Sequence, residues 1–236
     1  LKNLDFILEA PDVGVLKGAF QDVPLVLIAA GPSLDEAIPF LKQIEPYALM
    51  VGMNSSYRKL MAHGIRPHMT VSYDLFEGTY KGYDGVPTEN CCLISGCCVY
   101  PPTLGLFPHL RFHWSGGNLL VQWVRSQLGL PAATPILQQG TVSICVMDLA
   151  RLFGTRKLCL VGQDLSLGPA GQSHTLESFY QDEGINQEAL QGCTLLPGNV
   201  FEQVPVPAKM YTYLQMIEPF LAQCPQIEVV NTARWG

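Results

Sequence analysis

Two short stretches of the sequence place a glycine and a hydroxyl side chain directly before a predicted helix. The first is Gly31-Pro32-Ser33, which follows the apolar run 25–30, and the second is Gly140-Thr141. Glycine lets a ligand approach the backbone closely, and the first N–H groups of a helix favour an anion. Each turn could therefore hold a phosphate. Ser33 could also act only as a helix cap, and capping is the favoured interpretation of Thr141 taken alone.

Polar side chains follow other apolar runs as well. Asn54 comes directly after the run 48–53, and its amide could bind a base or a ribose, although asparagine is also common in surface turns. Asp74 and Asp164 end two further runs and suit ribose hydroxyls or a magnesium ion, although a lone aspartate there is often a cap. Gln163 precedes Asp164 in the same turn. Together these residues form a candidate nucleotide site.

His174 lies in the sequence GPAGQSHT, within a long segment rich in Gly, Pro, Gln and Ser. The pKa of histidine lies near neutral pH, so its imidazole could accept a proton from an incoming hydroxyl group. A lone histidine on a loop is more often a bystander. We nevertheless take His174 as the candidate general base.

Alternating apolar runs and amphipathic stretches must position these residues. Amphipathic helical patterns follow Ser33 and Gly140. A further predicted helix ends at Lys59–Gly64 with a glycine cap, and another covers 210–221 after Pro207. The predicted strands cover residues 25–30, 48–53, 68–74, 91–95, 110–114, 157–162 and 227–231. Several of them are continuously apolar, as in a sheet covered on both faces. The pattern predicts an α/β fold with a doubly wound, mostly parallel sheet, whose ligands bind at the carboxyl ends of the strands.

The 236 residues suffice for one domain of this kind. We expect a lead-in segment over 1–24 and a single Rossmann-like nucleotide-binding domain over 25–236. Residues 163–206 are predicted to form an irregular, lid-like or acceptor-binding excursion. The start at Leu1 without a methionine and the abrupt end at Gly236 suggest a fragment of a longer chain.

Composition and motifs exclude several classes of protein. The net charge of −6 argues against a nucleic-acid partner, and no apolar run approaches the ~20 residues that a membrane span needs. Neither a G-x-G-x-x-G fingerprint nor a Walker A loop is present, which disfavours NAD enzymes and P-loop NTPases. The eight cysteines include the cluster CCLISGCC (91–98), whose spacing matches no zinc motif. Cysteines inside apolar runs suit a reducing compartment, so we expect a cytoplasmic protein.

Several motifs in this order resemble the central domain of motility accessory factors. They are LVLIAAGPSLDEAIPFLKQ, HGIRPHMTVSYD, QQGTVSICVMDLARLFGTRKLCLVGQDLS, SHT and EVVNTARWG. The resemblance runs from about residue 10 to the end of the chain. Those proteins are proposed to attach nonulosonic, sialic-acid-like sugars to flagellin. The wider superfamily includes archaeal 6-hydroxymethyl-dihydropterin pyrophosphokinases (MptE-like proteins), and bacterial CMP-sialic-acid sialyltransferases are more distantly similar.

The resemblance implies a glycosyltransferase that moves such a sugar from a CMP donor to Ser or Thr of flagellin. It implies a CMP crevice lined by Gly31-Pro32-Ser33, Asn54, Gly140-Thr141 and Gly162-Gln163-Asp164, and we add Asp74 as a nucleotide-binding candidate from its place at a strand end. His174 and Asp164 are the predicted catalytic residues. Ser166 replaces an alanine of the family pattern. The phosphate-binding tyrosines of the sialyltransferases have three possible counterparts, which are Tyr180, Tyr211 and Tyr213.

Two alternatives remain open. The first is a pyrophosphokinase that transfers diphosphate from ATP to a pterin alcohol, with Asp74 and Asp164 as magnesium ligands. The second is a nucleotide-binding or flagellin-binding module without turnover. The glycosyltransferase hypothesis requires no cofactor, since the sequence has no D-x-D motif, but magnesium remains possible.

Overall fold

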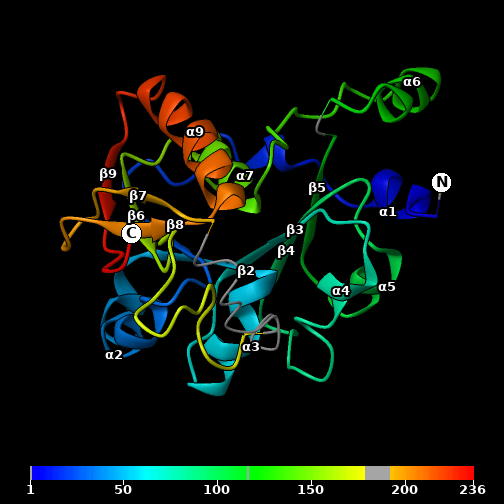
Figure 1. The fold of residues 1–236 in the computed structure, drawn as a ribbon. Coiled ribbons are helices and arrows are strands. Elements are labelled where there is room, and N and C mark those ends of the chain that lie inside the picture. Colours follow the sequence, from blue (N-terminus) through cyan, green and yellow to red (C-terminus); the bar gives the residue numbers. More distant parts are fainter. Residues whose placement is uncertain (1, 116, 179–191) are drawn as a thin grey trace.

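A single sheet of seven parallel strands forms the centre of the molecule (Figure 1). The computed structural model describes residues 2–115, 117–178 and 192–236. The strands are β1 (Leu25–Ile28), β2 (Leu49–Met53), β3 (Met69–Ser72), β4 (Cys92–Gly96), β5 (Arg111–Trp114), β6 (Lys157–Val161) and β9 (Glu228–Asn231). All seven coincide with the predicted segments, so the predicted α/β fold is confirmed.

The strand order β5-β4-β3-β2-β1-β6-β9 gives the sheet one reversal point. The chain starts in the middle at β1, moves outward through β2 to β5, and then returns to the other side of β1 with β6. Leu25 accordingly pairs with Leu49 on one side and with Leu158 on the other. In such sheets the crevice between the carboxyl ends of the two oppositely wound halves binds ligands.

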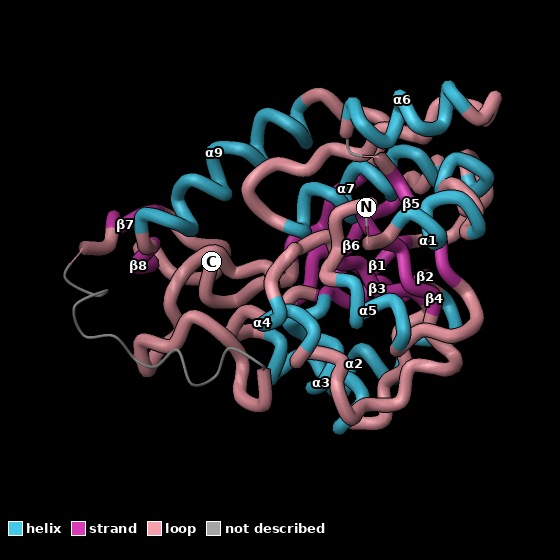
Figure 2. Tube along the Cα trace, turned by 90° about the vertical axis from the view of Figure 1, so that its right-hand side faces the viewer, coloured by secondary structure: helices cyan, strands magenta, loops and turns pink. Residues whose placement is uncertain are grey.

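Helices cover both faces of the sheet (Figure 2). The helices α2 (Leu34–Ile44) and α3 (Asn54–Ala62) pack on one face, where Val26 and Ile28 of β1 point. The helices α7 (Val142–Phe153) and α9 (Ala208–Ala222) pack on the other face, against Leu25 and Leu27. Successive β1 side chains thus enter opposite cores, which explains the continuous apolar run. The four predicted helical regions are confirmed.

The remaining elements lie at the edges of this core. They are α1 (Leu4–Glu9), α4 (Glu77–Tyr80), α5 (Pro101–Gly105), α6 (Leu119–Gln127), two 3-10 helices (Val13–Leu16 and Glu45–Tyr47), β7 (Thr194–Leu196) and β8 (Val204–Val206). β7 and β8 form an antiparallel hairpin within the excursion that was predicted to be irregular. Val204 and Val206 are buried, so the alternation typical of a strand is present there. Residues 179–191 of the excursion lie outside the described residues.

The cysteines of the described chain carry free thiols, and most of them are buried. Burial raises the pKa of Cys91 and Cys92 to about 12, so these side chains behave as small apolar residues. Within the described ranges, no helix has the length and apolarity that a transmembrane segment requires.

Candidate functional site

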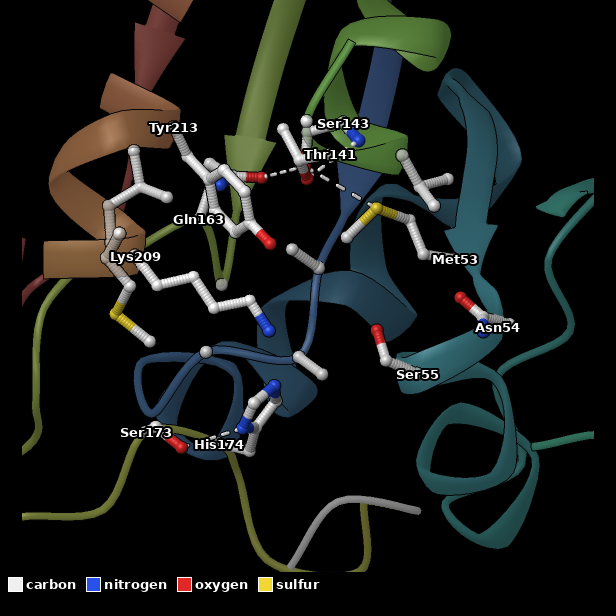
Figure 3. A pocket seen from close by; sticks show the side chains of 18 of the residues that line it. Met53, Asn54, Ser55, Thr141, Ser143, Gln163, Ser173, His174, Lys209 and Tyr213 are labelled. Atoms are coloured by element: carbon white, nitrogen blue, oxygen red, sulfur yellow. Dashed lines mark hydrogen bonds between the residues drawn. The ribbon is translucent and has the colours of Figure 1, made fainter. Parts of the chain in front are cut away.

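A pocket of about 480 Å³ opens at the carboxyl ends of β1, β2, β3 and β6, which is the reversal point of the sheet (Figure 3). It is also bordered by the first residues of α3, α7 and α9 and by part of the excursion. The lining includes Ala30, Gly31, Asn54, Ser55, Tyr73, Asp74, Gly140, Thr141, Ser143, Gln163, Asp164, Ser173, His174, Lys209 and Tyr213. Most of the predicted site residues therefore meet in one place.

Gly31 is required where β1 and β6 meet. Its N–H donates to the Gly162 carbonyl at 2.8 Å. A Cβ at position 31 would lie 2.2 Å from the Asp164 Oδ2 and 2.5 Å from the Gly162 oxygen. The absence of a side chain thus serves the contact between two chain segments, as well as leaving the floor of the pocket open.

Asp164 occupies the anion position at the start of α2. It is 4% exposed, and its carboxylate accepts hydrogen bonds from the Ser33 amide (3.1 Å), the Ser33 hydroxyl and the Trp235 amide (3.2 Å). Burial raises the pKa of Asp164, and the donors from Ser33 and Trp235 oppose that rise. Because a helix N-terminus favours negative charge, the carboxylate stabilises this turn where a ligand phosphate was expected.

The geometry therefore does not support a phosphate site at Pro32 and Ser33. Neither residue lines the pocket. The Ser33 hydroxyl donates to Asp164 and accepts a hydrogen bond from the Arg234 amide at 2.6 Å. It also makes no capping bond to its own helix. Contacts with Arg234 and Trp235 near the C-terminus occupy the β1–α2 turn in place of a ligand phosphate. The sequence pattern could not reveal this packing.

The start of α7 faces the pocket as predicted. Gly140 adopts a positive φ of 66°, and the Thr141 hydroxyl accepts a hydrogen bond from the Ser143 amide at 3.3 Å. Thr141 is therefore the cap of its helix and a lining residue at once. The Ser143 hydroxyl donates to the Gln163 side chain, which ties the end of β6 to this helix start.

The start of α3 forms a second helix terminus at the pocket. Asn54 is its first residue and only 4% exposed, and its side chain makes no hydrogen bond to any residue that the structure describes. The next residue, Ser55, points its hydroxyl into the pocket (Figure 3). The first N–H groups of a helix have no partner inside it. The starts of α3 and α7 thus bring backbone N–H groups and the side chains of Asn54, Ser55 and Thr141 to the pocket.

Lys209 and Asp74 bring charged side chains to the pocket lining. The Lys209 side chain extends into it from the first turn of α9, and its Nζ lies 6.0 Å from the centre of the Tyr213 ring (Figure 3). Burial raises the pKa of Asp74, while the positive charge of Lys209 lowers it. Burial also raises the pKa of Tyr73, which keeps this phenol protonated as a donor.

Lys209, Ser55 and Tyr73 are functional candidates that the sequence analysis missed. Pro207 does mark the helix start, but only the packing of α9 on α7 brings Lys209 to the strand ends. Of the three candidate tyrosines, Tyr213 lines the pocket and Tyr211 does not, whereas Tyr180 lies outside the described residues.

His174 enters the pocket from the excursion. Its Nδ1 lies 2.8 Å from the Ser173 hydroxyl, and Figure 3 shows its ring directed toward the pocket interior. The Nε2 is the ring nitrogen on the other side of the imidazole from this contact. The predicted base and the predicted nucleotide-binding residues thus share one cavity.

An all-parallel doubly wound sheet with a polar pocket at its reversal point defines a Rossmann-like α/β protein. The family model described as "6-hydroxymethylpterin diphosphokinase MptE-like" matches residues 1–169, and the chain belongs to this family. No curated protein matched the chain.

A solved structure extends the similarity to the fold of nearly the whole chain. The MAf glycosyltransferase from Magnetospirillum magneticum AMB-1 superposes with a TM-score of 0.71 and 19% identity over 91% of this chain. This chain covers 32% of that protein, about a third of its length. The resemblance drawn from the motifs is confirmed at the level of family and fold.

Proposed function

We propose that this chain transfers a nonulosonic, sialic-acid-like sugar from a CMP donor to a hydroxyl group, with Ser or Thr of flagellin as the acceptor. One observation carries the proposal: the starts of α3 and α7 and the Lys209 ammonium converge on one pocket. Backbone amides at helix starts and a lysine are the groups that bind a phosphate monoanion. The fold of the MAf glycosyltransferase adds support.

Different pocket residues bind the phosphate, the base and the ribose of the CMP donor. The phosphate of CMP lies against the first amides of α3 and α7 and the Lys209 ammonium. Asn54, whose amide has both a donor and an acceptor group to offer, binds the cytosine or the ribose. Asp74 accepts hydrogen bonds from ribose hydroxyls. The pocket volume of about 480 Å³ falls within the usual range for small-molecule sites.

Transfer then requires one bond to form and one to break. The acceptor oxygen attacks the anomeric carbon, and the bond from that carbon to the phosphate oxygen breaks, leaving its electron pair on CMP. The proton of the acceptor hydroxyl goes to the His174 Nε2, while the contact of Nδ1 with Ser173 orients the ring. Lys209 and the two helix starts stabilise the charge that develops on the phosphate. Asp164 acts by holding Ser33 and Trp235 in place.

The residues present do not fit the magnesium site expected for a pyrophosphokinase. The Asp164 oxygens already accept three hydrogen bonds. Within the described part of the chain, no group of three or more His, Cys, Asp or Glu side chains is arranged for a metal ion. The Asp164 carboxylate, which also lines the pocket, is occupied by Ser33 and Trp235, and we derive no step through a metal.

Diphosphate transfer from ATP to a pterin alcohol is the second candidate. The description of the family that matches residues 1–169 favours it. It requires that Asp164 release Ser33 and Trp235 to bind magnesium beside Asp74.

Thermal-shift measurements and product analysis separate these candidates. Stabilisation by CMP without magnesium, and transfer of the sugar from its CMP donor to flagellin detected by mass spectrometry, support the glycosyltransferase. Stabilisation by ATP only with magnesium, together with a diphosphorylated pterin product, overturns it in favour of the kinase. Flagellin binding without an effect of either nucleotide would indicate a non-catalytic module.

A further inference from the structure

Lys59 is a buried lysine that the mechanism above does not use. Its side chain is 5% exposed, and it lies on α3. A buried ammonium group is costly unless it is paired and hydrogen-bonded. Lys59 forms an ion pair with Asp35 in the first turn of α2, and its Nζ donates to the Leu176 carbonyl at 3.1 Å. One side chain therefore connects α2, α3 and the excursion.

Asp35 also holds the excursion directly. The Thr175 hydroxyl donates to the Asp35 carboxylate at 2.6 Å, and the Thr175 amide donates to the Ala30 carbonyl at 2.8 Å. Thr175 is buried. Its two hydrogen bonds anchor the excursion to the end of β1 and to the start of α2, beside the floor of the pocket.

Two further contacts extend this attachment to α3. The Ser178 hydroxyl donates to the Ser55 carbonyl at 3.3 Å, and the His63 Nε2 lies 3.0 Å from a Glu177 carboxylate oxygen. Both contacts join the excursion to α3. The segment 175–178 is thus fixed to two helices and a strand end.

His174 directly precedes this anchored segment. We infer that Lys59 and Asp35 are positioning residues, which hold the His174 imidazole in the pocket by clamping Thr175 and Leu176. The inference rests on the proposed function only for the proton-accepting role of His174. The clamp itself follows from the hydrogen bonds.

The simplest test removes one hydrogen-bond donor of this attachment while keeping the shape of the side chain. Thr175→Val deletes the hydroxyl that donates to Asp35, and Thr175→Ser restores a hydroxyl. Lys59→Met deletes the ammonium group. Thr155→Val is the matched control, because Thr155 is also buried but its hydroxyl has no hydrogen-bond partner among the described residues.

The readout is the NMR signal of His174 in the full chain labelled with ¹³C at the histidine Cε1. The chain has five histidines, and His174→Gln assigns the relevant signal. We expect Thr175→Val and Lys59→Met to move the His174 signal toward that of free histidine and to narrow it. The signal of buried His113 should stay in place, as should every signal in Thr155→Val. Thr175→Ser should restore the wild-type position.

The same variants have a kinetic consequence for sugar transfer. A displaced base should lower kcat about tenfold or more while the KM for the donor changes less than about twofold. An unchanged His174 signal in Thr175→Val overturns the clamp, and this holds even if Lys59→Met fails to fold. If the signal moves but the wild type transfers no sugar, the clamp is supported and the proposed function is refuted.

Discussion

Replacement of Lys209 by methionine tests the phosphate role of the pocket most specifically. Lys209 extends into the pocket from α9 and is the residue whose charge lowers the pKa of Asp74. Methionine keeps the length of the aliphatic chain and removes only the charged donor. We therefore expect Lys209→Met to weaken binding of the phosphate without disturbing the fold.

The expected magnitude follows from the position of Lys209. A hydrogen bond to a charged group contributes about 1.5–3 kcal/mol when it is well shielded. Lys209 is exposed, so solvent screening reduces this to about 1–2 kcal/mol. That free energy corresponds to a loss of about 5- to 30-fold in CMP affinity. The loss should shrink as ionic strength rises from about 0.01 M to about 0.15 M.

Isothermal titration calorimetry with two ligands measures this effect. CMP and cytidine differ by the phosphate alone, so Lys209→Met should weaken CMP and leave cytidine unchanged. Lys157→Met is the control variant, because Lys157 is an exposed lysine at the amino end of β6 that pairs with Glu228. Equal losses for both ligands, or an unchanged CMP affinity, would show that Lys209 does not bind the phosphate.

Three further predictions concern stability, measured by urea unfolding. Gly31→Ala should cost about 1–3 kcal/mol, since the new Cβ would overlap Asp164 and Gly162, whereas Gly105→Ala, with nothing within 4 Å, should be nearly neutral; equal costs would contradict the packing argument. Thr141→Val should cost about 1 kcal/mol through loss of the α7 cap, and Thr141→Ser should recover most of it. Burial raises the folded pKa of Asp74 above its ordinary value of 3.8, so the folded state binds more protons than the unfolded state between the two values. The wild type should therefore lose stability relative to Asp74→Asn as the pH rises through that window, and a difference independent of pH would argue against the pKa shift.

The strands were predictable because burial on both faces leaves a direct mark on the sequence. The run LVLIAA sends alternate side chains into two cores and is apolar throughout. The helix α6 was not identified, since Leu119 and Trp123 are 83% and 60% exposed and the apolar pattern does not mark a buried face. The short strand β8 lies in a segment whose Pro and Gly content indicated a loop.

The candidate site was predictable only where residues adjoin the strand ends. Asn54, Thr141 and Gln163 follow strands or begin helices, so topology alone brings them together. The bond between Ser33 and Asp164 joins residues 131 positions apart, and no local pattern records it. Lys209 reaches the pocket because α9 packs across α7, which is likewise a property of the tertiary structure.

The most direct measurement is a crystal structure of the chain grown with CMP. We predict electron density for the phosphate within hydrogen-bonding distance of the Lys209 Nζ and of the first amides of α3 or α7, with Asp164 still bound to Ser33. Density for the phosphate at the start of α2 with Asp164 displaced, or CMP bound outside this pocket, would contradict it.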